Sequence, residues 1–111
     1  MPVVNTGRFD INYIQEGDGE PVLLIHGLAG DHTAWLPQVA ALKDRYRVIA
    51  FDNPGSGNST TVAKPASTAD LAEATLSLMD ELGIDSAQVI GRSMGGAIAQ
   101  HMALKAPERV R

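Results

Sequence analysis

Apolar and polar positions follow two different periods along the chain. Residues 9–13 alternate between apolar and polar side chains, the period of a strand with one exposed face. A turn pattern at 5–7 predicts a short strand before it. Residues 22–25 (VLLI) and 48–51 (VIAF) are apolar throughout, which is typical of strands covered on both faces. A further short strand is predicted at 87–90.

Three segments with helical spacing separate or follow these strands. Trp35, Val39 and Leu42 lie at i, i+4 and i+7, so we expect Trp35 to pack in the core. A second helix is predicted from a cap at Thr68. The third helix, 94–105, carries small or apolar residues on nearly every face, which predicts packing on several sides. The order is β-β-β-α-β-α-β-α, and helical crossovers imply a predominantly parallel sheet flanked by helices.

Composition narrows the class of protein. A chain of 111 residues suits a single domain over 1–111, and 44% apolar with 20% charged residues is ordinary globular usage. The net charge of −4 favours neither nucleic acid nor an anionic membrane as a partner. The absence of cysteine excludes disulfides, thiolate metal sites and cysteine nucleophiles. Without a signal-peptide pattern or a long apolar run, we expect a cytoplasmic protein.

The segment VIGRSMGGAIAQ, residues 89–100, predicts a strand that turns directly into a helix. Ser93 occupies the corner, between Gly91 and Gly95. Such a turn forces strained dihedral angles on the corner residue, and glycine on either side removes Cβ atoms that would collide. The hydroxyl of Ser93 is then lifted clear of the backbone at a helix N-terminus, where amides favour negative charge. Ser93 is therefore the candidate nucleophile.

Two backbone amides are candidates for stabilising an oxyanion beside Ser93. The amide of Met94 immediately follows the serine. The amide of Leu28, in the glycine-rich loop after residues 22–25, is the candidate second donor. In that loop Gly27 lets the backbone approach closely, and His26 can hold the loop through hydrogen bonds.

At this point the chain resembles the N-terminal portion of an α/β-hydrolase. Four motifs carry the resemblance in family order: HGLAG (26–30), DNPGSGNS (52–59), GRSMGG (91–96) and APERV (106–110). Within the family the chain looks most like small bacterial lactonases, C–C bond hydrolases and esterases. The resemblance implies acyl transfer from a small-molecule substrate, with no metal or organic cofactor. It also implies an acid and a histidine after the nucleophile, together with further strands, helices and often a cap, all absent from this sequence.

A base for Ser93 is not evident in the sequence. His101 lies eight positions along the same helix, about 12 Å away, and is expected at the helix surface. His26 is expected to be structural, and His32 to lie in a mobile loop. Asp52 is expected to brace its own Pro-Gly loop. The triad is therefore predicted to be incomplete, and the chain alone inactive or very weak.

Other functions remain open. GRSMGG (91–96) is one letter from the Gly-x-Gly-x-x-Gly pattern of a nucleotide-binding module, although serine replaces the middle glycine. A catalytically inert fragment that acts by association is a further alternative. If no strand follows Arg111, the strand at 87–90 becomes an open edge that favours self-association or a complementing C-terminal half. Arg92 could meet an anionic substrate, but structural hydrogen bonds are the favoured interpretation.

Overall fold

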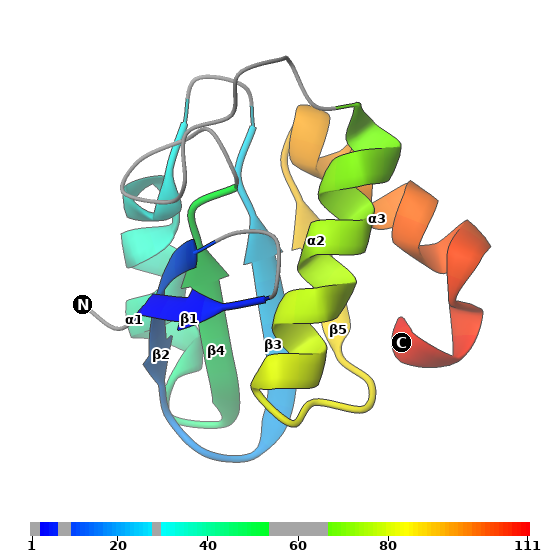
Figure 1. The fold of residues 1–111 in the computed structure, drawn as a ribbon. Coiled ribbons are helices and arrows are strands. Elements are labelled where there is room, and N and C mark those ends of the chain that lie inside the picture. Colours follow the sequence, from blue (N-terminus) through cyan, green and yellow to red (C-terminus); the bar gives the residue numbers. More distant parts are fainter. Residues whose placement is uncertain (1–2, 7–9, 28–29, 54–66) are drawn as a thin grey trace.

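A computed structural model describes residues 3–6, 10–27, 30–53 and 67–111 (Figure 1). Five strands form one sheet in the order β1-β2-β4-β3-β5. The strands are β1 (Val3–Asn5), β2 (Asp10–Glu16), β3 (Glu20–Ile25), β4 (Tyr46–Phe51) and β5 (Gln88–Gly91). Strand β3 is parallel to β4 and β5, whereas β2 runs antiparallel to β1 and β4. The predicted element order and the parallel core of the sheet are confirmed.

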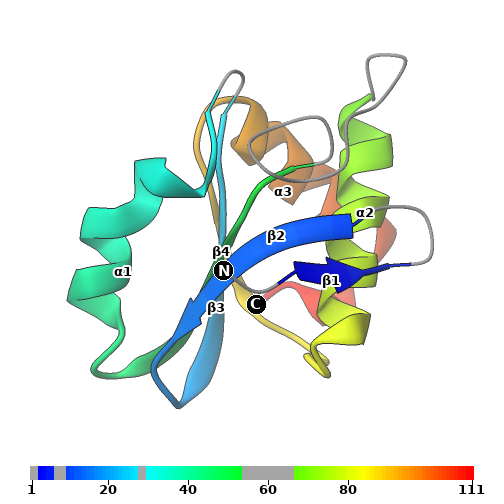
Figure 2. The same cartoon turned by 60° about the vertical axis from the view of Figure 1, so that its left-hand side comes forward.

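The sheet separates two hydrophobic layers. Helix α1 (Leu36–Leu42) covers one face, and α2 (Thr68–Glu81) and α3 (Met94–Lys105) cover the other (Figure 2). Strand β3 serves both layers because successive side chains point to opposite faces. Val22 and Leu24 pack with Trp35 on the α1 side, whereas Leu23 and Ile25 belong to the α2–α3 side. Uninterrupted apolar sequence in β3 therefore reflects burial on both faces, and the prediction that Trp35 lies in the core is confirmed.

Local sequence sets the ends of α2. Its N-cap is Ser67, one residue before the predicted Thr68, and Ser67 and Asp70 form a reciprocal capping box. The correction has a simple cause, because only Ser67 has an acidic residue three positions on. Gly83 follows the helix with φ +71°, a conformation that favours glycine. None of the helices in the described part of the chain combines the length and the apolar character needed to cross a membrane.

The fully buried residues of α3 are Gly95, Ile98 and Met102. The helix also packs against α2, β3 and β5, which confirms the predicted packing on several sides, but the face that carries Leu104 is open, with Leu104 83% exposed. The neighbouring strand β5 is bonded along one edge to β3. On its other side the described residues supply a parallel bridge between Ala87 and Val110.

Candidate active site

Ser93 lies at the junction of β5 and α3. Its backbone has φ 56° and ψ −115°, and it is the one non-glycine residue with positive φ in the described ranges. Strained backbone of this kind costs of order 1–3 kcal/mol and persists only where the surroundings hold it. The side chain is exposed and makes no capping hydrogen bond to α3. The hydroxyl therefore faces outward from the sharp turn that the sequence predicts.

Two glycines make that turn sterically possible. A Cβ on Gly91 would lie 2.1 Å from the carbonyl oxygen of Gly95, and a Cβ on Gly95 would lie 2.1 Å from the carbonyl oxygen of Ile25. Both obstacles are backbone atoms, which cannot rotate away as a side chain can. The close approach of α3 to the end of β3 thus depends on the missing side chains at both positions.

The first turn of α3 leaves one amide beside Ser93 without a partner. The N–H of Gly95 donates to the carbonyl of Arg92 at 2.9 Å, and the N–H of Gly96 donates to the carbonyl of Ser93 at 2.9 Å. The N–H of Met94 makes no such bond within the described part of the chain. Unpaired amides at a helix N-terminus carry partial positive charge, so this position favours a developing anion.

A cleft of about 290 Å³ opens over Ser93 and is lined by Gly27, Gly30, Ala34, Arg92 and Ser93. Gly27 comes so close to the turn that a Cβ there would lie 3.3 Å from the Cβ of Ser93. The predicted second amide, that of Leu28, lies outside the described residues. The structure thus places Gly27, just after β3, against the serine.

His26 connects that loop to β4. Its ring is fully buried, with Nδ1 2.7 Å from the carbonyl oxygen of Gly27. Its Nε2 lies 3.0 Å from the backbone nitrogen of Asn53 and accepts a hydrogen bond from it. The proton therefore resides on Nδ1, which donates to Gly27. Because both ring nitrogens are engaged, His26 is not available as a base for Ser93.

His32 is held more firmly than a mobile loop would allow. It begins a short 3₁₀ helix (His32–Trp35), is buried, and both its backbone N–H and its Nδ1 contact Oδ1 of Asp52, at 2.7 and 2.8 Å. Asn12 donates to the other oxygen of Asp52 at 2.9 Å. The expected mobile loop at His32 is thus wrong. Within the described residues, Asp52 connects the 3₁₀ helix to β2 through these hydrogen bonds. The Pro-Gly loop that Asp52 was expected to brace lies outside the described residues.

The same region holds the one cluster of potential metal ligands found among the described residues. Asp31, His32 and Asp52 offer ligand atoms within 4.8 Å of one another. Oδ1 of Asp31 already accepts hydrogen bonds from the backbone and hydroxyl of Thr33, and Oδ1 of Asp52 is bonded to His32. The hydroxyl bond, together with the backbone bond of Thr33, lowers the pKa of Asp31. Because all three residues already hold the 3₁₀ helix and its cap through hydrogen bonds, we interpret the cluster as structural.

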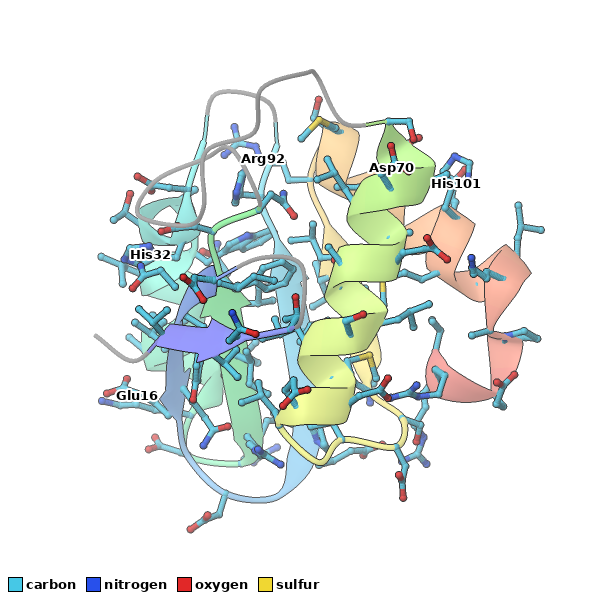
Figure 3. All side chains as sticks on the ribbon, viewed as in Figure 1. Glu16, His32, Asp70, Arg92 and His101 are labelled. Atoms are coloured by element: carbon cyan, nitrogen blue, oxygen red, sulfur yellow. The ribbon has the colours of Figure 1, made fainter. Side chains whose placement is uncertain are left out.

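His101 lies on α3, far along the helix from Ser93. Figure 3 shows it on the outer side of α2 and α3, whereas Arg92 lies at the carboxyl end of the parallel strands. A groove lined by His101, Asp70, Glu73 and Lys105, among others, occupies that outer side, and Lys105 pairs with Glu73 across it. The histidine therefore belongs to a different surface from the cleft over Ser93.

The chain was compared with known protein families and with curated proteins. A family model described as alpha/beta hydrolase fold matches residues 20–111. Over all 111 residues the chain is 39% identical to a protein of Azorhizobium caulinodans provisionally named carbamate hydrolase RutD, of which it covers 42%. It is 33% identical over 100 residues to (E)-2-((N-methylformamido)methylene)succinate hydrolase of Acinetobacter baylyi, covering 90% of this chain and 38% of that protein.

Solved structures agree with the sequence matches. The enol-lactonase from Burkholderia xenovorans LB400 superposes with a TM-score of 0.94 and 31% identity, covering 99% of this chain and 44% of that one. The chain thus spans less than half the length of each of these proteins. With a family model matched over residues 20–111 and the same fold in a solved relative, the chain belongs to the α/β-hydrolase family and corresponds to the N-terminal portion of its fold.

Proposed function

We propose that Ser93 is the nucleophile of a serine hydrolase that cleaves ester-, lactone- or C–C-type bonds by acyl transfer. The observation that carries this proposal is the strained turn at Ser93, which presents an exposed hydroxyl beside the unpartnered N–H of Met94. Backbone strain at a solvent-facing serine is typical of a functional position.

The proposed reaction begins with attack of the Ser93 oxygen on a substrate carbonyl in the cleft. The carbonyl oxygen gains negative charge as the tetrahedral intermediate forms, and the N–H of Met94 donates to it. The N–H of Leu28 is the proposed second donor. Collapse of the intermediate expels the leaving group and leaves an acyl-Ser93 ester, which water then hydrolyses. Gly27, Gly91 and Gly95 support this arrangement by letting backbone segments approach each other.

A base must accept the proton of Ser93, and none of the three histidines is placed to do so. Both ring nitrogens of His26 are bonded, His32 is bonded to Asp52, and His101 faces another surface. His26 could not take up this role without breaking buried hydrogen bonds, and His32 is not among the residues that line the cleft over Ser93. We therefore propose that the catalytic acid and histidine are supplied by residues beyond these 111, and that the chain alone is inactive or very weak.

The free edge of β5 is the proposed place for that complement. Its outer side carries the Ala87–Val110 bridge, and Ile90 on the same strand is 44% exposed. Unpaired backbone groups on an edge strand accept another strand, whether from a complementing C-terminal half or from a second copy of the chain. A catalytically inert fragment that acts only by association remains the second candidate, favoured by this edge and by the exposed Leu104.

The names of the relatives support chemistry at a carbonyl carbon. They refer to a carbamate, to a substituted succinate and to an enol-lactone. The shared step is transfer of an acyl group, and we extend only that step to this chain.

A fluorophosphonate probe tests the proposal, because it phosphonylates activated serines. The chain is treated alone and after addition of the C-terminal half of a related α/β-hydrolase, and the modified residue is located by mass spectrometry. We expect labelling at Ser93 that requires the added half, is lost in Ser93→Ala, and persists in Ser77→Ala, a serine on α2 remote from the cleft. Absence of labelling in both preparations, with stable self-association, would favour the inert fragment.

A further inference from the structure

Arg92 is the charged residue of the cleft that contains Ser93. The other residues lining it in the described part of the chain are Ser93, two glycines and an alanine, which offer little beyond backbone polarity. A guanidinium is positively charged at every physiological pH and presents five donors in a plane. Among the described residues that line the cleft, Arg92 is therefore the one whose side chain offers a ligand a charge.

The side chain of Arg92 has no internal role that would account for it. It is exposed, and it makes no hydrogen bond or ion pair with any residue in the described ranges. The structural hydrogen bonds that the sequence favoured for Arg92 are thus not found there. Its backbone, by contrast, is fixed: the N–H donates to the carbonyl of Ile25 at 3.1 Å, and the carbonyl accepts from Gly95 at 2.9 Å. A fixed backbone carries a free cationic side chain next to the serine.

The acidic groups nearest the cleft in sequence are already occupied. Asp31, which follows Gly30, bonds to Thr33, and Asp52 is buried against His32 and Asn12. The chain as a whole is negative, with a net charge of −4. The net charge opposes anion binding in general, so a local cation that no described carboxylate neutralises gives the cleft a charge preference of its own.

We propose that Arg92 is a specificity-determining residue that selects substrates carrying a carboxylate near the reacting carbonyl. This inference rests on the proposed function, because it assumes that the cleft over Ser93 receives the substrate. The fork of the guanidinium binds a carboxylate through two parallel hydrogen bonds. A half-ester or a lactone with a pendant carboxylate would thereby be held by its charge while its carbonyl meets Ser93. Neutral esters lack this contact.

Binding to Ser93→Ala tests this preference without requiring catalysis. Monomethyl glutarate and dimethyl glutarate differ in one negative charge, and each is titrated against this variant while amide and arginine Nε–H shifts are followed by NMR. Exposed ion pairs are worth up to about 1 kcal/mol, so we expect the monoester to bind roughly fivefold more tightly. We also expect the preference to shrink as salt is raised, since the contact is open to solvent.

Two matched variants assign the preference to one residue. Arg92→Gln is expected to abolish it, and Arg92→Lys to retain part of it. Arg45→Gln makes the same charge change just before the amino end of β4, whereas the cleft lies at the carboxyl ends of the parallel strands. This control should leave the preference for the monoester intact. Equal binding of the two esters, or no binding of either, would overturn the inference. The labelling of Ser93 is measured separately, so failure of the proposed function would be seen independently.

Discussion

Two adjacent glycines in α3 should respond in opposite ways to the same substitution. A Cβ on Gly95 would lie 2.1 Å from the carbonyl oxygen of Ile25 and 2.8 Å from that of His26, whereas ordinary contact begins at 3.4 Å. The nearest atom to a Cβ on Gly96 is the carbonyl oxygen of Gly91, at 3.6 Å. Gly95→Ala therefore forces two backbone segments apart, and Gly96→Ala fills available space.

The two substitutions should change the free energy of unfolding in opposite directions. Overpacking a buried contact costs about 1–3 kcal/mol, and backbone obstacles place Gly95→Ala at the upper end. Gly96→Ala removes the conformational entropy cost of a helical glycine and should stabilise by about 0.5 kcal/mol. With a urea slope of roughly 1.5 kcal/mol per molar, Gly95→Ala should lower the unfolding midpoint by more than about 1 M, while Gly96→Ala raises it slightly.

Urea unfolding can be followed in this chain by fluorescence of its single tryptophan, Trp35, which is 7% exposed. Circular dichroism of the helices provides a second probe, and coincident transitions would justify a two-state analysis. Equal midpoints for Gly95→Ala and Gly96→Ala would refute the reasoning, because they would show that α3 does not approach β3 as closely as the structure has it.

Two further changes probe the loops around the cleft. His26→Phe keeps an aromatic ring, although a larger one, but removes the acceptor of the Asn53 N–H, so we expect a loss of about 1–3 kcal/mol in urea unfolding, and unchanged stability would contradict the proposed anchoring. Hydrogen bonds from Thr33 lower the pKa of Asp31, so its ionised form stabilises the fold above its unfolded pKa, and that contribution is lost as pH falls through the folded value. The stability difference between the parent and Asp31→Asn should therefore be larger at pH 5 than at pH 3, and a constant difference would show that ionisation of Asp31 plays no part.

Local patterns determined much of this protein. The uninterrupted apolar runs in β3 and β4 and the turn at Ser93 follow from a few neighbouring residues, because strand burial and backbone strain are short-range properties. The boundaries shifted by a residue or two, as at Ser67, where a capping box competes with the adjacent threonine. The resemblance to the α/β-hydrolases rested on such local motifs in order, and the family comparisons confirm it.

Tertiary structure alone decided which polar groups are engaged and which are free. Asp52 bonds to a histidine 20 positions away and to an asparagine 40 positions away, and no local signal marks those partners. His26 is withdrawn from proton transfer because folding brings the Asn53 amide to its Nε2. Arg92 stays without a partner in the described residues, although its sequence suggested structural bonds. Hydrogen bonds between segments depend on strand order and loop placement, which residue types and spacing do not specify.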